Sequence, residues 1–181
     1  METKVFATIT LLVLFLQSNA QSEKNKFIFG IKGGYNHTVI NGYETNGAKT
    51  GFIGSTVFGS LFGERGISEN KFLSAEFTYS WVNDWNFVEI PFHFRQMLNR
   101  QISIFAGPKL DVAADKIDKS KESTSRLLGI SAEAGAQYDF SHHLFGEVKY
   151  SVGVTENFND VFFDINNGKR DNFRIGAGYR F

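Results

Sequence analysis

The sequence predicts an all-β fold, an eight-stranded antiparallel transmembrane β-barrel. Three observations favour it. Apolar and polar residues alternate with a period of two along most of the chain, whereas helical periodicity is nearly absent. The alternating stretches reach about ten residues, the length that a tilted strand needs to cross a bilayer. The composition agrees, with 20 Phe and 18 Gly against only two Pro.

The N-terminus is predicted to be a secretory signal peptide. An apolar run from Val5 to Leu16 is followed by small residues and an expected cleavage after Ala20. The run is shorter than the roughly 20 apolar residues of a membrane-spanning helix. The expected organisation is a signal peptide over 1–20, a short N-terminal segment over 21–25 and a barrel over 26–181.

The first four expected strands are bounded by polar or glycine-containing clusters. The stretch 26–38 (KFIFGIKGGYNHT) opens the series with alternating aromatic residues. In 50–62 (TGFIGSTVFGSLF) two apolar series compete, so which of them faces lipid stays open. The stretches 71–81 (KFLSAEFTYSW) and 86–97 (NFVEIPFHFRQM) are the third and fourth expected strands.

The last four expected strands are 101–113 (QISIFAGPKLDVA), 127–139 (LLGISAEAGAQYD), 143–154 (HLFGEVKYSVGV) and 171–181 (DNFRIGAGYRF). The last strand ends on an aromatic residue and has an apolar and a polar face. It must pair with the first strand, because an unpaired edge in hydrocarbon leaves backbone groups without partners.

The connections between these strands are unequal. Long polar loops are expected after the first, fifth and seventh strands, and the connections LNR and FSH after the fourth and sixth are short. Two connections depart from this pattern. The third is shorter than the other loops expected at its rim, and the second, which includes ERGISEN, is longer than the other turns expected at its rim. Long loops at one rim and short turns at the other are typical of an outer-membrane barrel with periplasmic termini.

The two faces of the expected strands differ in charge. One carries aliphatic and aromatic residues and no charge, and the other collects the ionisable residues. An eight-stranded barrel is just wide enough for side chains to fill it, so we expect these residues to form an interior charge network without an open pore. Its expected members are Lys32, Glu76, Glu89, His93, Arg95, Lys109, Asp111, Glu133, Glu147, Lys149, Arg174 and Arg180.

A soluble barrel with an apolar interior, such as a periplasmic ligand carrier, is the alternative that composition alone allows. Strand length, aromatic residues near strand ends and glycines on the charged face favour the membrane arrangement. The chain has no cysteine, which excludes disulfides and thiolate metal sites. Its net charge of zero gives no indication of nucleic acid as a partner.

Histidines are the main candidates for chemistry. His93 shares its expected face with Glu89 and Arg95, and a hydrolytic or metal site there is weighed against an interior hydrogen-bonded plug, which we favour. His142 and His143 are adjacent in a short turn and would make a poor chelate. We expect no catalytic residue, no metal and no cofactor.

A candidate partner-binding loop precedes the last strand. Asn167-Gly168 is a hairpin turn signal flanked by apolar residues, so the seventh and eighth strands could extend as a ribbon presenting Phe158, Phe162 and Phe163 to a protein partner. The alternative is that these rings pack within the loops.

Five short stretches resemble a known family: GIKGGYN (30–36), FVEIPFHFR (87–95), AGPKLDV (106–112), GEVKYSVGVTE (146–156) and GAGYRF (176–181). They are similar to the PorT-like outer-membrane β-barrels of Bacteroidota, often called porin family proteins. The resemblance implies an OmpA/OmpX-like architecture in the outer membrane of a Gram-negative cell envelope. It also implies a C-terminal aromatic residue that the barrel-assembly machinery reads, so Tyr179 and Phe181 are the expected C-terminal assembly signal.

The sequence therefore favours a non-enzymatic outer-membrane barrel with a filled lumen and a structural or surface-interaction role through extracellular loops. The expected partners are outer-membrane lipid, the barrel-assembly machinery during biogenesis, and a protein at the loops. The alternatives are a component of an envelope assembly such as protein secretion machinery, and a small membrane-embedded enzyme or narrow channel.

Overall fold

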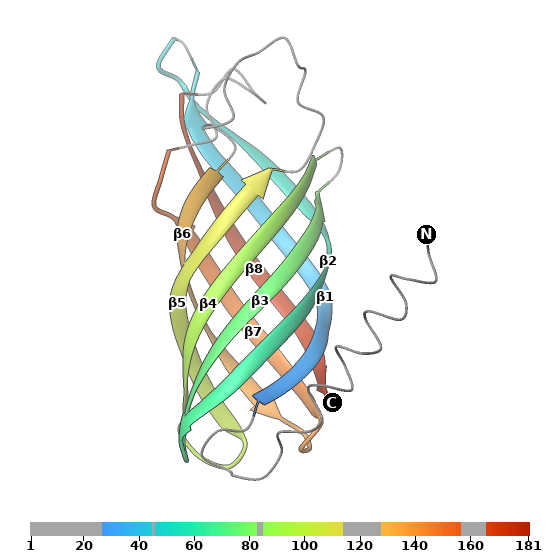
Figure 1. The fold of residues 1–181 in the computed structure, drawn as a ribbon. Helices are drawn as coiled ribbons and strands as arrows, with labels where there is room; N and C mark the ends of the chain where they lie inside the picture. Colours follow the sequence, from blue (N-terminus) through green and yellow to red (C-terminus); the bar gives the residue numbers. More distant parts are fainter. Residues whose placement is uncertain (1–26, 45, 83–84, 114–127, 157–165) are drawn as a thin grey trace, which may run out of the picture.

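The computed structural model describes residues 27–44, 46–82, 85–113, 128–156 and 166–181. Eight strands pair in sequence order and antiparallel into a closed barrel (Figure 1). This confirms the predicted fold class. The strands are β1 (Phe27–Tyr43), β2 (Lys49–Ser68), β3 (Lys71–Val82), β4 (Trp85–Met97), β5 (Ile102–Ala113), β6 (Leu128–Asp139), β7 (Leu144–Gly153) and β8 (Asn166–Arg180). Among these residues, no helix has the length and apolar character to cross a membrane.

The barrel closes between the first and the last strand. β1 pairs with β8 from Gly30 opposite Arg180 to Tyr43 opposite Asn166. Beyond the end of β8, the backbone N–H of Phe181 donates to the carbonyl of Phe29 at 2.9 Å. Closure gives every strand two neighbours over the membrane-spanning part, which satisfies the backbone groups that lipid cannot.

A glycine allows close contact at this seam. A Cβ atom on Gly34 of β1 would lie 2.2 Å from the carbonyl oxygen of Ile175 and 2.5 Å from the Cα atom of Gly176, both in β8. The neighbouring Gly33 has its nearest contact at 3.5 Å. Of these two neighbouring glycines of β1, only Gly34 is therefore required for the backbones to approach, and Gly176 opposite it is similarly constrained, since its Cβ atom would lie 2.8 Å from the carbonyl oxygen of Gly33.

The two rims differ from the sequence prediction in the first two connections. β2 continues to Ser68, so the expected long turn around ERGISEN is strand, and only Glu69 and Asn70 connect β2 to β3. The expected long first loop is likewise mostly strand, because β1 and β2 pair as far as Tyr43 opposite Lys49. The remaining turn contains Gly47 at φ 82°, a backbone conformation that glycine adopts without strain.

β8 also begins earlier than predicted. Asn167 and Gly168 are not a hairpin turn but lie within β8, where these two residues face the single residue Gly42 of β1 in a bulge. β7 ends at Gly153 and stops pairing with β8 at Ser151 opposite Asn172. The predicted ribbon of the seventh and eighth strands is therefore wrong. Instead, β1, β2 and the first residues of β8 project beyond the other strands (Figure 1).

Apolar side chains cover the outside of the barrel, and charged side chains fill it. On β2 the outward series is Ile53, Val57 and Leu61, of which Leu61 is 62% exposed, whereas Phe58 and Phe62 are buried inside. This resolves the facing that the sequence left open. This arrangement excludes a soluble carrier, whose apolar side chains would line the interior. An apolar outer wall is instead what a barrel surrounded by hydrocarbon requires.

Candidate functional site

The structure brings the twelve ionisable residues of the expected network together on the inner wall. Eleven of them are buried, and the side chain of Lys32 is 7% exposed. Alternation along each strand places them there, since residues two apart share a face. They form a loop-side cluster, a central cluster and two ion pairs near the turns.

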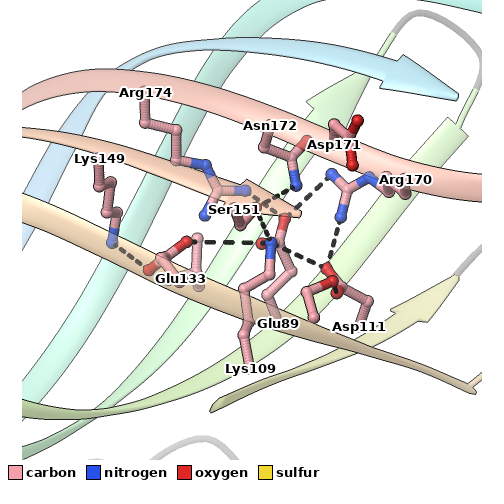
Figure 2. A network of polar contacts seen from close by, with 12 residues as sticks. Glu89, Lys109, Asp111, Glu133, Lys149, Ser151, Arg170, Asp171, Asn172 and Arg174 are labelled. Carbon is pink, nitrogen blue, oxygen red and sulfur yellow. Dashed lines mark hydrogen bonds and ion pairs between the residues drawn. The ribbon is translucent and has the colours of Figure 1, made fainter. Parts of the chain in front are cut away.

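The loop-side cluster is centred on Glu89 of β4 (Figure 2). Arg170 and Arg174 lie four residues apart on the inner face of β8. Both contact the Oε1 atom of Glu89, Arg170 at 3.1 Å. Lys109 of β5 approaches the other oxygen at 3.1 Å. Asp111 accepts from Arg170 at 2.8 Å and lies 3.2 Å from Lys109. Three cations therefore share two carboxylates, and all five side chains are fully buried.

The central cluster has the opposite balance. Lys32 contacts Glu76 and lies 2.9 Å from Glu147. Lys149 lies 3.0 Å from Glu76 and 3.3 Å from Glu133. Two lysines here meet three carboxylates, so the charges of the two clusters compensate each other. Lys109 of the loop-side cluster lies 3.9 Å from Glu133 of the central cluster (Figure 2).

His93 lies inside this central cluster. Its Nε2 atom is 2.9 Å from Glu133 and its Nδ1 atom is 3.5 Å from Glu76. Its ring also packs against Phe105, with centroids 4.8 Å apart. The residue faces the interior rather than the lipid, so it is placed to complete the hydrogen-bonded plug and not to act on a membrane substrate.

Two ion pairs lie near the turn-side rim. Arg95 donates from Nε and Nη2 to the two carboxylate oxygens of Glu64, at 2.8 and 2.5 Å. Arg180 donates to Asp139 at 2.8 Å. A bidentate pair is among the strongest polar contacts that a side chain can make.

The interior is electrically balanced and nearly full. The acids are Glu64, Glu76, Glu89, Asp111, Glu133, Asp139 and Glu147, and the bases are Lys32, Arg95, Lys109, Lys149, Arg170, Arg174 and Arg180. The cavity beside His93 and Lys32 has a volume of about 10 Å³. A space of this size holds at most about one water molecule. This part of the lumen is therefore closed.

Three members of the network were missed from the sequence. Glu64 lies just beyond the expected strand 50–62, whose lipid-facing side was left open. Arg170 lies one residue before the expected last strand, 171–181. Both could have been found by continuing the alternation, from Phe58 and Phe62 to Glu64, and backward from Arg174 through Asn172 to Arg170. Asp139 ends β6 and is half-buried, so alternation alone does not distinguish it from a rim residue.

Other predicted sites have mixed outcomes. Phe158, Phe162 and Phe163 and the signal peptide lie outside the described residues. Tyr179 and Phe181 are exposed on the outer wall, with ring centroids 5.7 Å apart. Among the described residues, no group of three side chains suits a metal ion.

His37 does have a partner, which the sequence did not indicate. It lies within β1, and its Nδ1 atom is 2.8 Å from Ser55 Oγ on β2. The cross-strand register places these two residues opposite each other. The contact therefore joins the first two strands on their outer face.

A closed eight-stranded barrel that is apolar outside and filled with paired charges inside defines an outer-membrane β-barrel protein. The chain belongs to the family described as outer membrane protein beta-barrel domain, whose model matches residues 8–181. This membership places it in the outer membrane.

Two solved structures illustrate the shared fold. Ail, the attachment invasion locus protein of Yersinia pestis, has a TM-score of 0.54 and 15% identity, over 86% of this chain and 99% of that chain. Neisserial surface protein A has a TM-score of 0.55 and 12% identity, over 84% of this chain and 97% of that chain. At such identities the likeness concerns the fold alone. No curated protein matches the chain.

Proposed function

We propose that this chain is a non-enzymatic, non-conducting surface protein of the outer membrane that binds a protein partner at its loop-side rim. The observation that carries the proposal is the combination of a lumen closed by paired charges with a sheet that continues beyond the barrel. We call this the projecting sheet: Val39–Tyr43 of β1, Lys49–Ser55 of β2 and Asn166–Asp171 of β8. Ail, whose structure contains the heparin analogue sucrose octasulfate, is a precedent for ligand binding by a barrel of this fold.

The edge of β2 indicates the kind of partner. β3 pairs with β2 only from Ser80 opposite Phe58 onward, so no described strand pairs with Lys49–Val57 on the side away from β1. Unpaired backbone groups cannot lie in hydrocarbon, so this edge belongs on the aqueous side of the membrane. A row of free N–H and C=O groups is complementary to an extended polypeptide segment, which adds as a further strand.

A second copy in the same membrane does not suit this edge. A two-fold axis along the membrane normal preserves the upward direction of each strand, and strands tilt by about 35–45° in such barrels. Two β2 edges would then cross at a steep angle instead of forming a ladder. The proposed partner is therefore a different polypeptide.

The test combines sidedness and conductance. Because the chain has no cysteine, Asn46→Cys in the β1–β2 turn and Asn99→Cys in the β4–β5 turn are clean probes. An impermeant maleimide should label Asn46→Cys on intact cells and Asn99→Cys only after permeabilisation. Purified protein in planar bilayers should give no steady current. Reversed labelling or a stable ohmic channel would overturn the proposal.

We also propose that the chain is a PorT-like barrel of Bacteroidota. In this proposal residues 1–20 direct its export. The resemblance adds a second candidate function, a component of an envelope assembly such as secretion machinery. The projecting edge favours it, because strand addition is a common way to join envelope proteins. Co-purification of a stoichiometric envelope complex with the wild-type chain from native membranes would support this candidate, and recovery of the barrel alone would count against it.

A further inference from the structure

A second concave surface lies at the opposite rim. A cavity of about 480 Å³ opens among the turns on the side of the termini. Its apolar wall includes Ile28, Phe72 and Phe140, and its cationic side chains are Arg95, Arg100 and Arg180. We call this the turn-side cavity. It is blind, because the small cavity of about 10 Å³ beyond Arg95 ends among the plug residues.

The carboxylates of the turn-side cavity are already bonded. Glu64 receives both hydrogen bonds of the Arg95 pair, and Asp139 accepts from Arg180 at 2.8 Å and from Gln137 at 2.9 Å. Arg100 has no carboxylate partner among the described residues. An excess of positive charge is therefore left at the mouth of the cavity.

Two residues at the mouth, Arg100 and His142, are presented by ordered turns. The Asn99 side chain accepts from the backbone N–H groups of Gln101 and Ile102, both at 2.8 Å, which fixes the turn that carries Arg100. The Ser141 hydroxyl accepts from the N–H groups of His143 and Leu144, which fixes the turn that carries His142. Both Arg100 and His142 line the cavity. Preorganised turns reduce the entropy that a ligand must remove on binding.

We propose that the turn-side cavity binds an oxyanion, the carboxylate or phosphate group of a small ligand or of a lipid headgroup, between Arg100, Arg180 and His142. Guanidinium groups match the geometry of both oxyanions and remain charged at any physiological pH. The aromatic and aliphatic wall would receive the apolar part of the ligand. This site is separate from the projecting sheet, so it can fail while the proposed function stands.

The test uses the full barrel in nanodiscs of neutral lipid, with inorganic phosphate as the probe and chloride at equal ionic strength as the reference. Phosphate should produce saturable amide shifts confined to 99–101, 141–143 and Arg180. Arg100→Gln should weaken binding about tenfold, the loss of one charge-assisted hydrogen bond. Lys71→Gln, an exposed cation of the same rim outside the cavity, should leave binding unchanged.

The source of the oxyanion is separated by a second arm. In nanodiscs of anionic lipid, weaker phosphate binding would identify a lipid headgroup as the competing ligand, and unchanged binding would identify a soluble anion. Shifts that do not saturate, that chloride reproduces, or that persist unchanged in Arg100→Gln would overturn the proposal. Because both substituted residues are exposed, neither variant should disturb folding.

Discussion

The guanidinium of Arg95 donates two hydrogen bonds to the carboxylate of Glu64, although the residues lie 31 positions apart and on strands that are not neighbours. The pair joins β4 to β2 over the inner face of β3, the strand between them. It is buried, and Arg95 also lies over the ring of Phe72 at 4.2 Å. Contacts of this kind across the barrel replace an apolar core.

The first prediction concerns this pair. Glu64→Gln should lower the free energy of unfolding by about 3–5 kcal/mol, because it leaves the Arg95 charge buried without its counterion. The double variant Glu64→Met and Arg95→Met removes both charges and should lose less than the Glu64→Gln single variant. Urea unfolding of barrels refolded in lipid vesicles measures both. A loss in the double variant equal to the sum of the losses in the Glu64→Met and Arg95→Met single variants would show that the residues are not coupled.

The second prediction concerns the loop-side cluster. Glu89→Gln should destabilise by about 3–5 kcal/mol or prevent refolding, because Lys109, Arg170 and Arg174 all contact this carboxylate and would repel one another without it. Glu156→Gln is the matched control. Its carboxylate faces Lys169 at 3.4 Å, but both side chains are nearly half exposed. The same unfolding assay should show a loss of at most about 1 kcal/mol there. Equal losses would contradict the central role of Glu89.

The third prediction tests barrel closure. Gly34→Ala should reduce the folded fraction, because the added methyl group would meet the backbone of β8 at 2.2 Å. Relief of this overlap costs about 1–3 kcal/mol. Gly33→Ala, whose nearest neighbour is at ordinary contact distance, should fold like the parent chain. Resistance to SDS at room temperature reports the folded fraction. A Gly34→Ala barrel as resistant as Gly33→Ala would exclude a tight seam.

The fourth prediction tests the free edge of β2. Amide hydrogen exchange should alternate along Lys49–Ser55, since every second N–H bonds to β1 and the others have no strand partner. From Phe58 to Arg65, where β2 has two strand neighbours, protection should be continuous. Uniform protection over Lys49–Ser55 would mean that the edge is covered in the isolated protein, and strand addition could not occur there.

The fifth prediction concerns the C-terminus. Phe181→Ala should lower the amount of barrel assembled in the outer membrane, if the terminal aromatic residue is part of an assembly signal. Phe140→Ala is the control, because it removes an aromatic ring with similar exposure, 62% against 73%, at the same rim. Cell fractionation with immunoblotting measures assembly. Equal effects would assign the loss to lipid contact instead of recognition.

Much of the fold could be predicted because strand alternation is a local property. The parity of Arg174 and Glu133 placed both on the charged face without any knowledge of their neighbours. The ends of strands were less accessible, because they depend on pairing with another strand. ERGIS reads as a polar turn by composition but forms strand, since β3 pairs along it and β1 pairs with its first two residues, Glu64 and Arg65. Asn167-Gly168 has the composition of a turn but forms a bulge opposite Gly42.

By itself, the sequence determined how many strands cross the membrane and, on every strand except β2, which side chains face lipid, because both follow from a period of two and from strand length. Only the tertiary structure decided which charges meet. Lys149 contacts Glu76 from 73 positions away, and Arg174 reaches Glu89 from 85. These contacts depend on the register of all eight strands together, since a shift of one residue anywhere in the barrel changes the height and the side of every group that faces the lumen.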